Sequence, residues 1–202
     1  YELYVYNRTS AKTQSLVASG AHACDSPGSV AEMCDIIFAI VGFPKDVETV
    51  FLGSNGIVEK AKPGSIIVDM TTSTPDLAKK IASVAIKKGL HSLDAPVSGG
   101  DVGAKSGMLS IMVGGKKEIF NRVLPLFELM GSNVVYQGSA GSGQHTKMAN
   151  QIGIASSMLA MCESLTYAKA AGLDQKTVLK SISSGAAGSW SLTNLAPRIL
   201  RL

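Results

Sequence analysis

The chain of 202 residues is 46% hydrophobic, 17% charged and 5% aromatic, and it carries a net charge of +4. This composition predicts a globular protein with one full α/β domain and part of a second, and it excludes a disordered chain. The mild charge indicates no nucleic-acid partner, and the longest apolar run, over 36–41, is too short to span a membrane.

Strand-like and helix-like segments alternate along the first two thirds of the chain. A strand over 2–6 is followed by a turn and by a helix that ends near Gly20. The strands are apolar throughout, which is typical of parallel strands buried on both faces. This alternation predicts an α/β fold with a doubly wound, Rossmann-type sheet. Further strands are expected over 36–41, 66–70, 90–93, 108–113 and 134–136, helices over 47–52, 75–88 and 118–130, and a glycine-rich loop over 97–107.

The pattern changes at Gly138. The glycine-rich stretch over 138–143 predicts a turn, and no strand-like segment follows it. We therefore predict a Rossmann-type domain over 1–138 and the start of an all-helical domain over 139–202. The helices expected after the boundary cover 144–171, 175–183 and a segment that begins near Ser189.

A dinucleotide-binding sheet normally begins with a strand and a G-x-G-x-x-G loop, because glycines let the backbone approach the pyrophosphate at a helix N-terminus. No such motif lies near Tyr1. The nearest match, over 138–143, follows the last strand of the domain, which disfavours a phosphate-binding role there. We expect the strand at Tyr1 to be the second of the sheet. The chain would then be an internal fragment that lacks the first strand and the end of the helical domain.

The turn after the first strand indicates the choice of cofactor. An acidic residue at this position hydrogen-bonds the ribose 2′-hydroxyl of NAD, whereas an arginine accommodates the 2′-phosphate of NADP. The chain has Asn7, Arg8 and Thr9 here, and the planar guanidinium of Arg8 suits a phosphate. We therefore predict that NADP binds to the domain over 1–138, with NAD as the alternative cofactor. The structural alternative is that Asn7 only caps a turn and Thr9 only caps a helix.

Two further polar segments follow buried strands, at the edge where open α/β sheets bind ligands. In the first segment, which follows the strand expected over 66–70, Thr72 is placed to reach the nicotinamide ribose. Ser73 or Thr74 also suits a helix N-cap before Pro75, and the two roles are compatible.

The second segment, from Asp94 to Gly100, combines a hydroxyl group with small residues. Exposed N–H groups at Ser98, Gly99 and Gly100 are candidates to hold a substrate carboxylate. A plain turn is the alternative.

Lys147 and Asn150 lie three residues apart in the long predicted helix, so both side chains project from one face. They are candidates for substrate chemistry, and a solvated surface lysine is the alternative.

Thiol and metal chemistry find no support in the sequence. The three cysteines form no C-x-x-C motif, and the three histidines have no partner at metal or triad spacing. We expect no metal site and a reducing compartment, either the cytoplasm or the matrix of a mitochondrion or plastid; any targeting region would precede Tyr1. The three cysteines are Cys24, Cys34 and Cys162, and the three histidines are His22, His91 and His145.

Two motifs carry a resemblance to a known family: the run from Asp94 to Gly100 and the pattern Gly141-x-Gly143-x-x-x-Lys147-x-x-Asn150. Together they resemble the β-hydroxyacid dehydrogenases, the family of 3-hydroxyisobutyrate dehydrogenase and the glyoxylate/succinic semialdehyde reductases. Their order and separation match the family, and the similarity covers essentially the whole chain. It is nearest to the plant 3-hydroxyisobutyrate dehydrogenase-like proteins.

The resemblance implies an NADP-dependent oxidoreductase that interconverts a short 3-hydroxy acid and its semialdehyde or 2-oxo acid. It implies that Lys147 is the general acid/base, that Asn150 orients the substrate and that Arg8 reads the 2′-phosphate. The expected partners are a small carboxylate substrate and a second copy of the chain in a homo-oligomer, with no nucleic acid and no membrane. Ser98, Gly99 and Gly100 would hold the substrate carboxylate, and Asn7, Thr9 and Thr72 would contact the cofactor.

Two alternatives to an active enzyme remain open. One is a non-catalytic scaffold that keeps the dinucleotide fold for oligomerisation, for which loss of the lysine would be the mark. The other is an inactive fragment, which without the glycine-rich loop would bind NADP weakly or not at all. The presence of Lys147 favours the enzyme over the scaffold.

Overall fold

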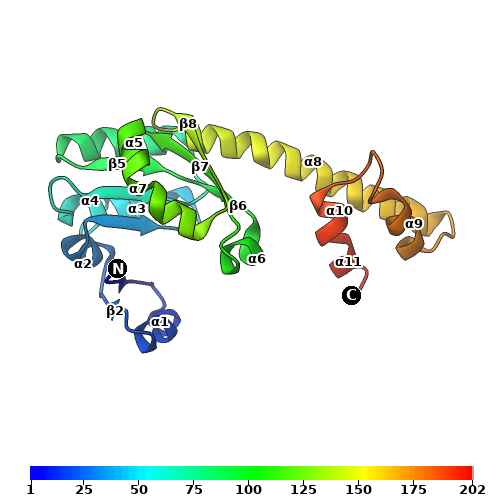
Figure 1. Cartoon of the computed structure of the whole chain (residues 1–202), viewed down its shortest axis with the longest axis horizontal. Helices are drawn as coiled ribbons and strands as arrows, with labels where there is room; N and C mark the ends of the chain where they lie inside the picture. The colour runs from blue at the N-terminus through cyan, green and yellow to red at the C-terminus, as the bar shows by residue number, and fades with distance from the viewer. Residues whose placement is uncertain (202) are drawn as a thin grey trace. The chain divides into compact units, whose positions relative to one another are not determined.

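The computed structural model describes residues 1–201 of the chain. The chain forms two compact units, Tyr1–Lys147 and Met148–Leu202. Helix α8 (Ser142–Ala170) contributes residues to both units (Figure 1). The boundary expected at Gly138 falls at the end of the last strand, whereas the two units divide inside α8.

The first unit alternates strands with helices along the chain. Five of its elements, β2, α2, α4, β6 and α6, were not predicted, because each is too short for a hydrophobic period to develop. The strands are β1 (Tyr4–Val5), β2 (His22–Ala23), β3 (Ile36–Ala39), β4 (Ile66–Asp69), β5 (His91–Asp94), β6 (Val97–Ser98), β7 (Ser110–Gly115) and β8 (Asn133–Gly138). The helices before α8 are the 3-10 helix η1 (Ser10–Thr13), α1 (Gln14–Ala18), α2 (Pro27–Met33), α3 (Pro44–Leu52), α4 (Ile57–Lys60), α5 (Pro75–Lys87), α6 (Gly100–Lys105) and α7 (Lys117–Met130).

Six strands form one sheet in the order β3-β4-β5-β7-β6, with β8 paired to β7. Strands β3, β4 and β5 are parallel and in register, so that Ala39, Asp69 and Asp94 end side by side. Strand β7 is antiparallel to β5 and β6 but parallel to β8. The predicted α/β fold of Rossmann type is therefore confirmed, although the sheet is mixed rather than wholly parallel. Strands β1 and β2 form a separate parallel pair.

Helices cover both faces of the sheet, and alternate residues of its strands supply two hydrophobic cores. In β4, Ile66 and Val68 join the core under α7, while Ile67 joins the core under α2 to α5. All three side chains are buried. Burying each one contributes roughly 1.5–3 kcal/mol relative to leaving it exposed. Strand β4 is thereby fixed between the two helical layers.

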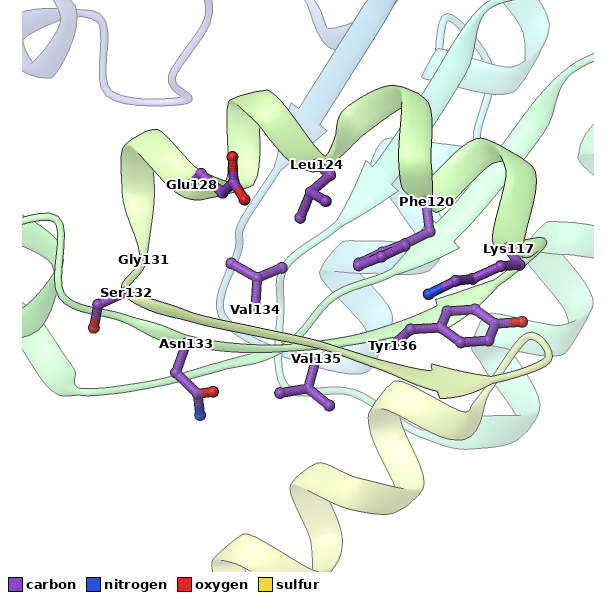
Figure 2. Close-up of a pocket in the computed structure, with 10 residues that line it drawn as sticks. All are labelled: Lys117, Phe120, Leu124, Glu128, Gly131, Ser132, Asn133, Val134, Val135 and Tyr136. Carbon is purple, nitrogen blue, oxygen red and sulfur yellow. The ribbon is translucent and has the colours of Figure 1, made fainter.

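Helix α7 packs on strand β8 through facing side chains. Figure 2 shows Phe120 and Leu124 of the helix directed towards Val134 and Tyr136 of the strand. The ammonium of Lys117 lies 4.4 Å from the centre of the Phe120 ring and 4.5 Å from that of Tyr136, which is a cation–π contact. A surface hollow of about 590 Å³ opens here. None of the residues predicted to bind substrate or cofactor lines this hollow.

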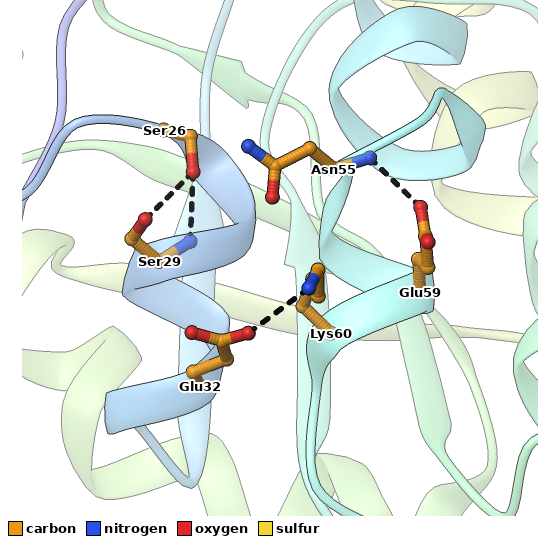
Figure 3. A network of polar contacts seen from close by, with 6 residues as sticks. All are labelled: Ser26, Ser29, Glu32, Asn55, Glu59 and Lys60. Carbon is orange, nitrogen blue, oxygen red and sulfur yellow. Dashed lines mark hydrogen bonds and ion pairs between the residues drawn. The ribbon is translucent and has the colours of Figure 1, made fainter.

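Polar contacts tie α2 to α4 (Figure 3). The hydroxyl of Ser26 caps α2 by accepting a backbone N–H of its first turn at 2.9 Å. In the turn before α4, the N–H of Asn55 donates to Glu59 at 2.8 Å. Lys60 of α4 then pairs with Glu32 of α2 at 3.3 Å. These contacts hold two short helices that have little intrinsic stability.

The glycine-rich loop predicted over 97–107 was wrong in its detail. It contains strand β6 and helix α6, and three of its four glycines lie where the helix begins or ends, whereas Gly103 lies within the helix. Gly99 and Gly100 have φ of 132° and 63° where the helix begins, and Gly107 has φ of 65° after it ends. These left-handed conformations explain the glycines without requiring an irregular loop.

The described residues of the second unit form helices joined by turns, as predicted for the chain after the last strand. The later turns of α8 pack through Met161 and Leu165 against Leu192 and Ala196. No helix in residues 1–201 combines the length and apolar character that a bilayer crossing requires. The helices after α8 are α9 (Gln175–Ile182), α10 (Trp190–Asn194) and α11 (Ala196–Ile199).

Candidate active site

The carboxyl ends of β4 and β5 lie side by side, because the two strands are parallel and in register. Thr72 follows β4, whereas Ser98 lies at the end of β6 and Gly99 and Gly100 lead into α6. Of these residues, only Thr72 leaves the sheet at the shared end of β4 and β5.

Asp94, the last residue of β5, binds the start of α8. Its Oδ1 accepts the N–H of Gly141 at 2.8 Å, and its Oδ2 accepts the N–H of Gln144 at 2.9 Å. Burial raises the pKa of Asp94, while these backbone donors act in the opposite direction. The N–H groups of Gly141 and Gln144 are thus used within the protein.

Glycine residues make this close approach sterically feasible. A Cβ atom on Gly114 would lie 2.6 Å from Oδ1 of Asp94, and one on Gly143 would lie 2.6 Å from the carbonyl oxygen of Asp94. Real Cβ atoms essentially never come this close to another atom. The site therefore requires residues without side chains where β5, β7 and α8 meet.

Gln144 was missed by the sequence analysis. Its side chain is fully buried, donates from Nε2 to the carbonyl oxygen of Thr71 at 2.7 Å and accepts the N–H of Ser73 at Oε1 at 2.8 Å. The first turn of α8 is thus bonded to the segment after β4 as well as to β5. No local pattern could have shown this, because the partners lie 71 and 73 residues away.

Lys147 lies in the next turn of α8 and is only 7% exposed. Burial lowers the pKa of its ammonium below the ordinary value of 10.5. No carboxylate of residues 1–201 lies within ion-pair distance of Lys147 to oppose this shift. The alternative that Lys147 is a solvated surface lysine is therefore wrong.

The other residues predicted to bind substrate have mixed surroundings. Ser98 pairs with Ser110 in the β6–β7 ladder and is half-buried, while Gly100 is exposed at the start of α6. Asn150 is half-buried in α8, three residues after Lys147, and its amide donates to Gln151 at 3.1 Å.

The residues predicted to bind the cofactor are exposed. Asn7 accepts the N–H of Thr9 at 2.9 Å, so the turn-capping role is confirmed, whereas Thr9 makes no capping hydrogen bond at η1. The side chain of Arg8 is 90% exposed and lies 4.0 Å from Asp46. Thr72 is exposed between two buried neighbours. The chemistry of this set, an exposed guanidinium and hydroxyl groups, suits a dinucleotide that carries a phosphate.

Asp69 at the end of β4 gives the unit a pH-dependent stability. Its Oδ1 accepts the N–H of Thr71, but its buried Oδ2 has no hydrogen-bond partner in residues 1–201. Burial is the main cause that raises the pKa of Asp69 to about 6, with a smaller contribution from the charge of Asp94. The folded state therefore binds a proton more tightly than the unfolded state, and the free energy of unfolding should fall as the pH rises from about 4 to about 6.

We expect the Asp69→Asn variant to lack this pH dependence. It should match the parent in stability at pH 4 and exceed it at pH 7 by up to about 3 kcal/mol. Urea unfolding at several pH values measures the difference, with the exposed Asp35→Asn as control. A constant difference across this range would contradict the prediction.

Comparisons with known proteins agree with this fold. Residues 1–138 match the model of the NAD-binding domain of 6-phosphogluconate dehydrogenase. Residues 141–201 match the model described as the NAD-binding domain of NADP-dependent 3-hydroxyisobutyrate dehydrogenase.

Individual relatives align with all or nearly all of the chain. The chain is 55% identical to the uncharacterized oxidoreductase YkwC of Bacillus subtilis, in an alignment that covers 100% of the chain and 70% of YkwC. It is 51% identical to the probable mitochondrial 3-hydroxyisobutyrate dehydrogenase-like 1 of Arabidopsis thaliana, of which it spans 60%. The crystal structure of a 3-hydroxyisobutyrate dehydrogenase from Salmonella typhimurium superposes on 98% of the chain, which matches 70% of that structure, with a TM-score of 0.89 and 26% identity.

Proposed function

The chain belongs to the β-hydroxyacid dehydrogenase family of NAD(P)-binding oxidoreductases, and from this premise we propose that it interconverts a short 3-hydroxy acid and its semialdehyde or 2-oxo acid with NADP. The observation that carries the proposal is the buried Lys147. It stands on a helix whose first turn is bonded to the ends of two adjacent parallel strands.

In the proposed reaction, Lys147 handles the proton at the substrate oxygen. Its ammonium donates a proton to the carbonyl oxygen during reduction, and its neutral amine removes the proton from the hydroxyl group during oxidation. Burial lowers the pKa of Lys147, which makes the neutral amine more accessible than in a solvated lysine. The nicotinamide supplies or accepts the hydride when the cofactor is bound.

We assign the carboxylate of the substrate to the segment from Ser98 to Gly100, where β6 ends and α6 begins. Ser98 offers a hydroxyl group, and the backbone N–H groups of Gly99 and Gly100 lie at the start of α6. Asn150, on the same helix as Lys147, would orient the substrate.

The direct test uses the whole protein with NADPH and short carboxylates that carry a carbonyl group. We expect oxidation of NADPH with succinic semialdehyde, glyoxylate or methylmalonate semialdehyde, followed at 340 nm. The matched control is the corresponding aldehyde without a carboxylate, which should react poorly. Absence of turnover with every one of these carboxylates would contradict the proposal.

We expect Arg8 to set the preference for NADP over NAD. Loss of charge-assisted hydrogen bonds worth roughly 1.5–3 kcal/mol should raise the Kd for NADPH about 10- to 100-fold in Arg8→Ala, while the Kd for NADH changes little. Isothermal titration calorimetry measures both constants, and Arg122→Ala, on the exposed side of α7, is the control. Equal weakening of both cofactors would show that Arg8 does not read the 2′-phosphate.

Assembly and compartment are part of the same proposal. In the second unit, Ile152, Leu159 and Tyr167 are exposed apolar residues seven and eight positions apart on α8, a spacing that places them on one face. This face supports a homo-oligomer. We further propose a reducing compartment, and the name of the Arabidopsis relative places that protein in the mitochondrion.

A further inference from the structure

The side chain of Gln144, in the first turn of α8, is fully buried. It bonds to Thr71 and Ser73 in the segment after β4. A buried carboxamide loses its hydration and is tolerated only when its donors and acceptor are matched. Here Nε2 and Oε1 each have a backbone partner. A glutamine this deeply buried is therefore placed by specific contacts rather than by hydrophobic packing.

The two backbone partners flank one residue. Gln144 bonds to the carbonyl oxygen of Thr71 and to the N–H of Ser73, and Thr72 lies between them with its own side chain exposed. The carboxamide therefore holds the backbone on both sides of Thr72 while leaving its hydroxyl group accessible. Only an amide offers one donor and one acceptor in this fork, since a carboxylate offers two acceptors and a thioether neither at comparable strength.

The backbone of the same residue is also anchored. The N–H of Gln144 donates to Asp94 of β5, and Gly143 approaches too closely for any side chain to fit. Lys147 is the third residue after Gln144 in the same continuous helix, so its Cα position is determined by this first turn. One residue thus connects the segment assigned to the nicotinamide with the helix that carries the lysine.

We propose that Gln144 is a positioning residue, which holds the Thr72 segment and Lys147 at a fixed spacing from each other. The inference rests on the proposed function, because it assigns Thr72 to the cofactor and Lys147 to the substrate. Proton and hydride transfer need both groups in place at once, so a small change in spacing lowers the rate more than it lowers binding. Gln144 itself touches neither reactant.

The test compares Gln144→Met and Gln144→Glu with the parent in the whole enzyme. Methionine keeps the length and removes both hydrogen bonds, while glutamate keeps the shape and the acceptor for Ser73 but loses the donor to Thr71. Gln14→Met, at an exposed position of α1, is the matched control. We expect kcat to fall at least tenfold in Gln144→Met and less in Gln144→Glu. KM for the substrate and Kd for NADPH should change less than threefold.

A second measurement needs neither cofactor nor turnover. NMR titration of the ¹³C-methylated amine at Lys147 should show its pKa rising in Gln144→Met, because a loosened first turn of α8 admits water to the lysine. A kcat within threefold of the parent, or a Lys147 pKa that does not move, would overturn the proposal. Failure of both variants to fold would assign Gln144 to stability alone and would overturn it as well.

The Lys147→Ala variant, run in the same assays, separates this inference from the proposed function. Turnover that survives in Lys147→Ala would refute the function whatever the Gln144 variants do. Loss of turnover in Lys147→Ala together with normal kcat in Gln144→Met would refute only the positioning role.

Discussion

Replacing Lys147 with alanine is expected to lower kcat by about 100- to 10,000-fold, the range typical for loss of a general acid or base. The buried ammonium has no ion-pair partner among the described residues, and burial lowers its pKa. The unfolded chain therefore binds the proton more tightly, so the charge opposes folding, and its removal should not lower the melting temperature. Stopped-flow and steady-state measurements of NADPH oxidation give kcat, and circular dichroism gives the melting temperature.

Two further variants sharpen this expectation. Lys147→Arg keeps the charge but cannot become a neutral base at ordinary pH, so it should abolish the oxidative direction. Lys169→Ala removes an exposed lysine from the last turn of the same helix and should leave kcat unchanged. In the parent, the rate of oxidation should rise with pH through an apparent pKa below 10.5. Substantial turnover in Lys147→Ala would refute the role of the lysine.

A methyl group on Gly143 should be the most damaging small change in the site. In Gly143→Ala, the new Cβ would overlap the carbonyl oxygen of Met112 and lie 2.6 Å from that of Asp94. Neither backbone atom can move without disturbing β5 or β7, so the start of α8 must shift instead. We expect a loss of stability of roughly 1–3 kcal/mol, as for other overpacked cores, and a fall in kcat because Lys147 moves with the helix.

Gly153→Ala is the matched control for this variant. Gly153 lies in the same helix, and a Cβ there would meet no atom within 4 Å. Alanine is favoured over glycine in a helix by about 1 kcal/mol, so this variant should be as stable as the parent or more so. Chemical unfolding of both variants measures the difference. Equal stability of the two would show that the space around Gly143 is larger than the structure indicates.

The sequence predicted those parts of the fold that depend on local pattern. The apolar runs of β3 and β4 and the long helix after Gly138 were expected close to their observed bounds. Helix α6 was not, because Gly100 and Gly103 lower its helix propensity and its stability depends on contacts outside the segment. The glycines were visible in the sequence, but which of them lie at the ends of a helix was not.

The candidate site shows the same division. Lys147 was found through a motif, and its burial became apparent only in the structure. Gln144 was not found, although it lies only three residues before the lysine, because its role depends on Thr71 and Ser73. Asp94 was noted as part of a motif, yet its bonds to α8 cross 47 and 50 residues. Such distant pairings leave no periodic trace in a single sequence.

The bonds from Asp94 and Gln144 also constrain the order in which the protein folds. Each closes a loop of about fifty to seventy residues, and the entropy of closing it must be offset before the contact forms. We therefore expect β4 and β5 to pair before these bonds form, because only then do their ends present one binding edge to α8. The turn that carries Lys147 should accordingly form late in folding.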